Sequence, residues 1–173
     1  MAEVTIATTG IKVVERDEIM RLLPHRDPIQ YIDRVVLNGQ NQAVGYWRVR
    51  PDHPILAGHF PDAPIWPGHL TAEMAAQVAG VLLLVEGNQI GDCVATLLAS
   101  SFKLSGAVFP SDDLEVEVYA DGVDAIWQAL VCGLRVAEGY LAFKLIPRIT
   151  FERMMARRGK TRLTKAESQV IAA

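Results

Sequence analysis

The stretch HLTAEMAAQVAGVLLLV, residues 69–85, decides the fold of this chain. Apolar side chains occupy almost every position over about four turns of predicted helix, so no face of that helix suits water. A helix of this kind has to be covered on every side by other elements. We therefore expect the rest of the chain to be built around it.

The segments on both sides of this helix are typical of β-strands, because they are rich in β-branched and aromatic residues. YIDRVVL and AVGYWRVR, joined by the turn-like NGQNQ, predict a hairpin before the helix. Strands joined by short turns are most simply antiparallel. The predicted class is α+β, with a long central helix wrapped by a curled antiparallel β-sheet. Four more strands, separated by loops and by the turns DGVD and AEG, are expected at residues 93–104, 114–120, 125–136 and 140–151.

Smaller features complete the expected fold. The segment RDEIMRLLPHR predicts a short helix with Asp17 as its N-cap, ended by Pro24. Cys93 and Cys132 are far apart in apolar strand-like runs, so we expect two buried free thiols.

Length, charge and hydropathy bound the class of protein. At 173 residues the chain suits one domain, expected at 1–151, followed by a basic tail at 152–173. No membrane span is expected, since the longest apolar run, Val78–Val85, is far shorter than the roughly 20 residues a bilayer needs. The net charge of −3 argues against a nucleic-acid partner. The N-terminus lacks a secretory signal pattern, so the expected location is cytoplasmic.

Glu73 and Gln77 form the only polar stripe on the apolar helix, because residues four apart lie on one helical face. One interpretation of Glu73 is a structural carboxylate, either at the solvent edge of the helix or hydrogen-bonded to Gln77. An apolar setting can also raise the pKa of a carboxyl until it donates a proton near neutral pH. We therefore consider Glu73 a candidate general acid.

A candidate base and an anion donor precede Glu73 within the same stretch. His59 stands in the proline-rich AGHFPDAP, where it is either a structural loop histidine or a base working near pH 7. Gly68 has no side chain to screen its amide at the helix entrance, which suits an oxyanion donor. Base, acid and donor together suit removal of a proton next to a carbonyl with loss of a β-hydroxyl.

Three segments resemble one known family. GHFPDAPIWPGHLTAEMAAQ (residues 58–77) resembles the signature of the β-hydroxyacyl-acyl-carrier-protein dehydratases, the FabZ and FabA enzymes, whose FabZ-type pattern is G-H-F-P-x-x-P-I-x-P-G-V-L-x-x-E-A-M-A-Q. LLPHRDPIQYIDRV (22–35) and KLSGAVFP (103–110) are similar to further family motifs. The resemblance implies the hot-dog fold, in which a sheet wraps a long helix.

The same resemblance implies an activity and a set of roles. His59 and Glu73 would be the catalytic pair, each supplied by a different subunit of a homodimer or trimer of dimers. Gly68 would donate to the thioester carbonyl, and Gln77 would support Glu73. The implied substrate is a (3R)-hydroxyacyl thioester on the phosphopantetheine of an acyl carrier protein, converted to the trans-2-enoyl thioester in fatty-acid or polyketide biosynthesis. No metal and no organic cofactor is implied.

The chain departs from the family pattern at four positions that the resemblance places near the acyl tunnel: Gln30, Tyr31, Trp66 and His69. These departures favour a specialised polyketide-type substrate over an ordinary fatty acyl chain. His25 also matches a family position, but we interpret it as a loop histidine. The basic tail is expected to dock the acidic carrier protein, through Arg153, Arg157, Arg158, Lys160, Arg162 and Lys165.

Two other functions use the same fold. An acyl-thioester hydrolase would need an activated water where a dehydratase needs a β-hydroxyl. A non-catalytic acyl-binding protein would have no use for an intact acid and base. The presence of both His59 and Glu73 favours dehydration over either alternative.

Overall fold

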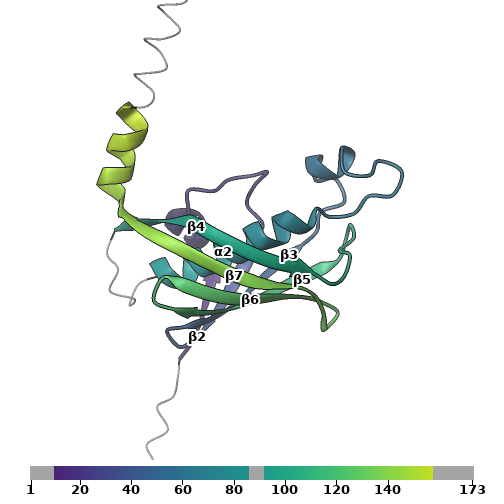
Figure 1. Ribbon diagram of the computed structural model, residues 1–173, viewed down its shortest axis with the longest axis horizontal. Coiled ribbons are helices and arrows are strands. Elements are labelled where there is room, and N and C mark those ends of the chain that lie inside the picture. The colour runs from purple at the N-terminus through teal and green to yellow at the C-terminus, as the bar shows by residue number, and fades with distance from the viewer. Residues whose placement is uncertain (1–9, 86–91, 158–173) are drawn as a thin grey trace, which may run out of the picture.

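Seven strands form one antiparallel sheet in the computed structural model, which describes residues 10–85 and 92–157 (Figure 1). The order across the sheet is β1-β2-β3-β5-β6-β7-β4. The central helix α2 spans Gly68–Leu84, as the apolar run predicts. The strands are β1 (Ile11–Glu15), β2 (Arg34–Asn38), β3 (Gln42–Arg48), β4 (Cys93–Leu104), β5 (Asp113–Asp121), β6 (Asp124–Val131) and β7 (Leu134–Pro147).

The sheet curls around α2. This helix contacts β2 near one end of the strand order and β4 at the other end, as well as the strands between them. Strands lie about 4.8 Å apart, so a flat sheet would carry its outer strands out of reach of a single helix. The predicted wrapped helix is therefore confirmed.

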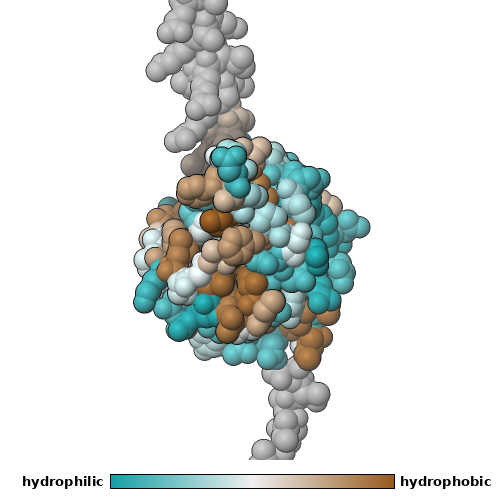
Figure 2. Space-filling view, turned by 90° about the vertical axis from the view of Figure 1, so that its right-hand side faces the viewer, coloured by the Kyte–Doolittle hydropathy of each residue, from teal (hydrophilic) through white to brown (hydrophobic). Residues whose placement is uncertain are grey.

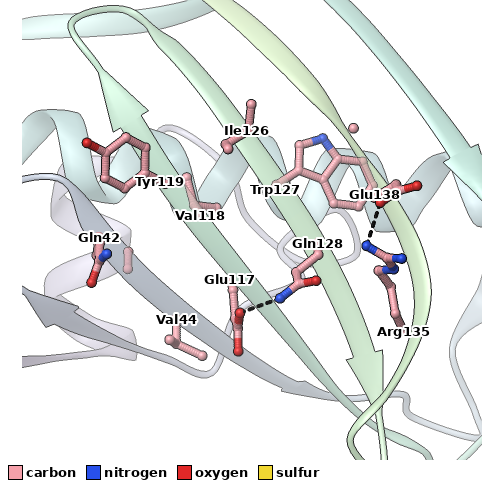
Figure 3. A pocket seen from close by; sticks show the side chains of 12 residues that line it. Gln42, Val44, Glu117, Val118, Tyr119, Ile126, Trp127, Gln128, Arg135 and Glu138 are labelled. Atoms are coloured by element: carbon pink, nitrogen blue, oxygen red, sulfur yellow. Dashed lines mark hydrogen bonds and ion pairs between the residues drawn. The ribbon is translucent and has the colours of Figure 1, made fainter.

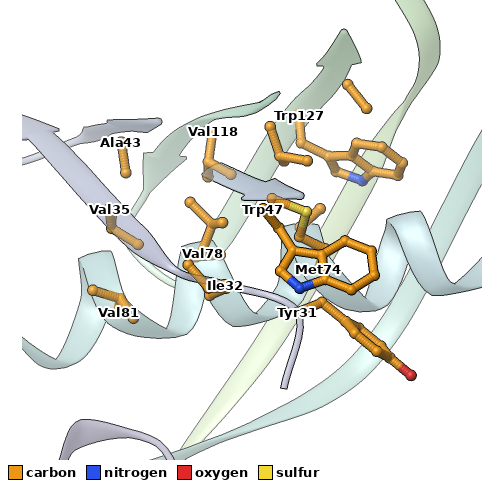
Figure 4. Packing of buried hydrophobic residues seen from close by; sticks show 14 of the residues in the cluster. Tyr31, Ile32, Val35, Ala43, Trp47, Met74, Val78, Val81, Val118 and Trp127 are labelled. Carbon is orange, nitrogen blue, oxygen red and sulfur yellow. The ribbon is translucent and has the colours of Figure 1, made fainter. Parts of the chain in front are cut away.

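The core lies between α2 and the inner face of the sheet (Figure 4). Met74 and Val78 of α2 are fully buried there, opposite Trp47 of β3. Gly45 of β3 lets the helix approach closely, since a Cβ at this position would lie 2.2 Å from Val78 Cγ2. Each fully buried aliphatic side chain contributes about 1.5–3 kcal/mol of transfer free energy. The core thus fixes the position of α2, which carries Glu73.

The predicted hairpin between β2 and β3 is confirmed, with Gly39 at a φ of 73° in its turn. The predicted turn DGVD likewise joins β5 to β6. The prediction of one strand over 125–136 followed by a turn at AEG is wrong. Val131 pairs with Leu134, so the turn lies at residues 132 and 133, and AEG lies inside β7.

Backbone geometry explains the misplaced turn. Cys132 and Gly133 have φ values of 51° and 75°, which is the geometry of a two-residue hairpin turn. Cysteine rarely adopts a positive φ, so the sequence does not predict a turn at this position. Cys132 is consequently exposed rather than buried as predicted, and Cys93 is partly buried.

The short helix α1 spans Arg16–Leu22 and buries Ile19. Its N-cap is Glu15 rather than the predicted Asp17, because β1 runs directly into the helix. Asp17 instead lies in the first turn, where its charge complements the helix dipole.

A further helical segment follows β7 directly. Residues 148–157 are helical, so β7 ends before the predicted strand end at 151, and the expected domain boundary falls within this helix. Ile149, Met154 and Met155 are exposed on it. The rest of the basic tail and the first nine residues lie outside the described residues. Within residues 10–85 and 92–157, no helix is long and apolar enough to cross a membrane.

Candidate active site

Glu73 is held on α2 by a buried amide. Gln77, one turn further along the helix, donates from Nε2 to Glu73 Oε1 over 2.9 Å. Gln77 is itself anchored, because its Oε1 accepts from the backbone N–H of Tyr31 at 3.0 Å and its Nε2 also donates to Ile29 O at 2.7 Å. The carboxyl of Glu73 therefore has a fixed orientation at the edge of the core.

His25 is the imidazole that lies against Glu73. Its Nε2 is 3.4 Å from Glu73 Oε1, and both side chains are partly buried. Burial lowers the pKa of His25; the negative charge of Glu73 opposes this shift and the positive charge of Arg26 adds to it. Sequence reasoning treated His25 as a loop histidine, and its match to the family motif was the only signal of a role.

His59 follows the short 3₁₀ helix η1 (Pro54–Ala57) in the proline-rich loop. Its Nδ1 lies 2.7 Å from the carbonyl oxygen of Ile65. A carbonyl only accepts hydrogen bonds, so Nδ1 carries the proton and Nε2 keeps a free lone pair in the neutral ring. The geometry therefore gives His59 the form of a base.

His59 and Glu73, the predicted catalytic pair, do not contact each other through a hydrogen bond or ion pair among the described residues of one chain. No hydrogen bond or ion pair links His59 to Glu73 in the described part of the chain, where the partners of Glu73 are Gln77 and His25. Each half of the pair is thus oriented by its own neighbours: His59 by the loop and Glu73 by the helix.

Gly68 is the first residue of α2, so its N–H has no acceptor within the helix. A Cβ on Gly68 would lie 2.3 Å from Leu104 Cδ1, at the end of β4. A side chain at this position would displace the exposed side chain of Leu104, against which the helix entrance packs. The same absence of a side chain leaves the amide open to a ligand oxygen.

Two of the four predicted tunnel residues belong to a cluster of rings. The ring centroid of Trp66 is 5.1 Å from Tyr31, 4.7 Å from Trp47 and 5.2 Å from His53. Trp66 and Tyr31 are almost completely buried. The pKa of Tyr31 is raised by burial and by the negative charge of Glu73. Sequence reasoning missed Trp47 and His53, because their contact with Trp66 is made only in the fold.

The other two tunnel residues differ in exposure. Gln30 is 2% exposed, and neither its Oε1 nor its Nε2 has a hydrogen-bond partner within residues 10–85 and 92–157. The indole N–H groups of Trp47 and Trp66 are also buried and unpaired. His69 is exposed in the first turn of α2. The four side chains thus differ in burial, and their place at an acyl tunnel stays a prediction.

A separate hollow of about 690 Å³ lies on the outer face of the sheet (Figure 3). Glu117 and Tyr119 of β5 line it and point away from α2, whereas Val118 between them is buried against the core. No predicted site residue lines this hollow. No group of three or more histidine, cysteine, aspartate or glutamate side chains among the described residues is placed to hold a metal ion.

Apolar side chains gather at the end of the molecule where α2 begins (Figure 2). The segments that meet at this end expose Ile55, Phe60, Leu104 and Phe109. Phe60 adjoins His59, and Leu104 packs on Gly68. Two of the candidate catalytic groups therefore lie beside an exposed apolar surface.

A buried helix wrapped by an antiparallel sheet defines a protein of the hot-dog fold, and in this chain a carboxyl lies on the helix and a histidine precedes it. Solved structures agree on the fold. The dehydratase heterocomplex ApeI:P from Xenorhabdus doucetiae matches with a TM-score of 0.61 at 17% identity, over 79% of this chain and 96% of that one. A hot-dog-like protein from Thermanaerovibrio acidaminovorans matches with a TM-score of 0.54 at 14% identity, over 68% and 89%.

Sequence comparison gives the family. The FabA-like domain family matches residues 23–139, and the chain belongs to this family. It is 34% identical over 146 residues to the 3-hydroxyacyl-[acyl-carrier-protein] dehydratase FabZ of Rhizobium etli, covering 81% of this chain and 94% of that protein. It is also 34% identical over 136 residues to FabZ of Herpetosiphon aurantiacus, covering 75% and 96%.

Proposed function

We propose that the protein dehydrates a (3R)-hydroxyacyl thioester carried on an acyl carrier protein and releases the trans-2-enoyl thioester. The curated relatives are named for this class of reaction. The observation that carries the proposal is that each group has one atom in a hydrogen bond and one atom left for the substrate. His59 Nδ1 is hydrogen-bonded and Nε2 is not, while Glu73 Oε1 is hydrogen-bonded and Oε2 is not, among the described residues.

The reaction follows from these two open atoms. His59 Nε2 removes a proton from C2 of the substrate, next to the thioester carbonyl. The electron pair forms the C2–C3 double bond as the C3–O bond breaks. The protonated carboxyl of Glu73 gives its proton to the departing hydroxyl, which leaves as water. The Gly68 N–H bonds the thioester oxygen while it bears negative charge.

A second copy of the chain completes the site in this proposal. His59 and Glu73 are not linked within one chain, as the family's shared site would require. Strand β4 is at the edge of the sheet and pairs only with β7. An open edge with apolar side chains readily accepts another strand. The exposed apolar residues of β4 are Leu97, Leu98, Phe102 and Leu104.

The acyl group is proposed to be short, bulky or polar, as in polyketide-type biosynthesis. Gln30 is buried with an unpaired amide, and the indole N–H groups of Trp47 and Trp66 are unpaired nearby in the ring cluster. A buried polar group without a partner costs about 1–3 kcal/mol. A ligand with hydrogen-bonding or aromatic groups would remove part of this cost, whereas a long saturated chain would not.

Incubation of the purified protein with a 3-hydroxyacyl-pantetheine tests the proposal. A product that has lost one water, detected by mass spectrometry, is the expected result. A freed thiol without loss of water would instead indicate the thioester hydrolase. Unchanged substrate, both as the pantetheine and on the carrier protein, would leave a non-catalytic acyl-binding protein.

A further inference from the structure

We infer that His25 is a positioning residue for Glu73: its neutral imidazole donates from Nε2 to Glu73 Oε1 and so holds Oε2 toward the substrate. The inference rests on the proposed function, because it assigns His25 a part in the same reaction. The contact joins the loop after α1 to the middle of α2, over 3.4 Å between Nε2 and Oε1.

Two nitrogen atoms lie near the same oxygen of Glu73, Gln77 Nε2 as a hydrogen-bond donor and His25 Nε2 at ion-pair distance. Gln77 Nε2 lies 2.9 Å from Oε1. The orientation of that amide is forced, because the N–H of Tyr31 has to face the Gln77 oxygen, at 3.0 Å. The nitrogen of Gln77 therefore points to Glu73. Oε1 meets Gln77 and His25, while Oε2 has no hydrogen bond in the described part of the chain.

The surroundings of His25 determine which nitrogen carries its proton. Nδ1 is buried and has no hydrogen-bond partner within residues 10–85 and 92–157. A proton on Nδ1 would be a buried donor without an acceptor, which is costly. The proton therefore resides on Nε2, facing the carboxyl. Burial and Arg26 lower the pKa of His25 against the opposing charge of Glu73, so the neutral ring is favoured.

This arrangement decides where the acidic proton of Glu73 lies. An O–H on Oε1 would face the N–H groups of both Gln77 and His25. The proton of the carboxyl is thus restricted to Oε2, the atom open to the β-hydroxyl of the substrate. A charged His25 would stabilise the carboxylate and hold back that proton. Neutrality of His25 is therefore part of its role.

Two substitutions separate positioning from packing. His25→Leu removes the donor, and we expect kcat to fall about three- to tenfold with little change in KM, since one hydrogen bond is lost. His25→Gln keeps a neutral N–H donor and should recover most of that loss. Asp27→Asn is the matched control in the same loop, because Asp27 binds Arg16 through both carboxylate oxygens at 3.0 Å without touching the imidazole.

Three kinetic results would overturn the inference about His25. An unchanged kcat in His25→Leu overturns the inference. So does an equal loss in the Leu and Gln variants, or a loss in Asp27→Asn as large as that in His25→Leu, because packing of the loop would then explain the effect.

A second measurement does not depend on activity. Nitrogen-15 NMR of the imidazole rings at pH 7, with His25 assigned through the spectrum of His25→Gln, should show a neutral ring protonated at Nε2. A proton on Nδ1, or a charged ring, overturns the inference. If the wild-type protein does not dehydrate the pantetheine substrate, the proposed function fails, and the NMR result still decides the state of His25.

Discussion

At the scale of single residues, His59 owes its basic form to Ile65. The carbonyl of Ile65 holds the Nδ1 proton, so the lone pair of Nε2 is available. Gln77 has the corresponding effect on Glu73, since it engages Oε1 and is itself held by two backbone groups. Each reactive atom is left open because its neighbour on the same side chain is occupied.

We predict that His59→Ala and Glu73→Gln each lower kcat by about 10²–10⁴, the usual contribution of a positioned base or acid. Neither substitution removes a group from the fully buried core, so the circular dichroism spectrum and the melting temperature should stay close to those of the wild type. Turnover of the same 3-hydroxyacyl-pantetheine measures the effect. Wild-type rates in both variants would contradict the mechanism.

His25 should make the stability of the protein depend on pH. Its pKa is lowered in the folded state by burial, against the attraction of Glu73 and with the help of Arg26; Tyr31 also faces Glu73. The unfolded chain therefore binds this proton more readily, and stability rises with pH over this range. We expect the free energy of unfolding to fall as pH drops below about 6.5, the ordinary histidine value.

Urea unfolding of wild type and His25→Gln, from about pH 5 to about pH 8, tests the sign of this pH dependence. As pH falls, the free energy of unfolding of the wild type should decrease relative to that of His25→Gln. In a Glu73→Gln background the attraction that raises the pKa of His25 is lost, so this relative decrease should be larger. A difference that is constant with pH would contradict the lowered pKa.

At the scale of elements, the sequence was sufficient where pattern and packing agree. The apolar run at 69–85 predicts α2 to within one residue, and the spacing of Glu73 and Gln77 predicts their hydrogen bond. The turn at Cys132 could not be predicted from the sequence, because it requires a positive φ, which cysteine rarely adopts. The contact of His25 with Glu73 was missed because only the folded chain brings that loop to α2.

The helix at residues 148–157 gives the basic tail a defined start. Arg153 and Arg157 are exposed on this helix, and further basic residues follow outside the described part of the chain. Clustered positive charge speeds encounter with an acidic partner more than it strengthens the final contact. We therefore expect this segment to guide the carrier protein to the site.

Replacing Arg157, Arg158 and Lys160 by Glu should raise KM for substrate on the carrier protein and leave KM for the small pantetheine substrate unchanged. The effect should weaken at high salt, because exposed charges are screened. Glu substitutions at Arg21, Arg135 and Lys144, three exposed basic residues elsewhere, control for the change in net charge. An equal effect on both substrates, or none, would exclude docking by this segment.

At the scale of the whole molecule, the site depends on how many chains form it. If each site takes His59 from one chain and Glu73 from another, mixing inactive His59→Ala with inactive Glu73→Gln should restore activity. Random exchange makes half of the dimers hybrids, each with one intact site, so about a quarter of wild-type activity is expected. Rates measured after subunit exchange, itself followed with differently tagged chains, test this. Confirmed exchange without recovery would place both groups of a site in one chain.

The proposed choice of substrate depends on two separate segments of the fold, because Gln30 and Tyr31 are buried in the loop before β2 and Trp66 in the loop before α2. Each methylene of an acyl chain gains roughly 0.8 kcal/mol on burial, while an unpaired polar group in the wall costs about 1–3 kcal/mol. We therefore expect an acyl group that reaches the free amide of Gln30 to gain little from a longer saturated chain and more from a group that bonds the amide.

Comparison of kcat/KM across straight 3-hydroxyacyl thioesters, beside unsaturated, cyclic and aromatic analogues, tests this balance. We expect efficiency to level off early in the straight series and to be highest for a polar or aromatic acyl group that can stack on Trp66. In Gln30→Leu, which replaces the buried amide by an apolar side chain, longer straight chains should gain relative to polar ones. Gln42→Leu is the matched control, because it makes the same change at an exposed glutamine of β3 whereas Gln30 is buried. A steady rise of wild-type efficiency with straight-chain length, unaltered by Gln30→Leu, would identify an ordinary fatty-acyl dehydratase instead.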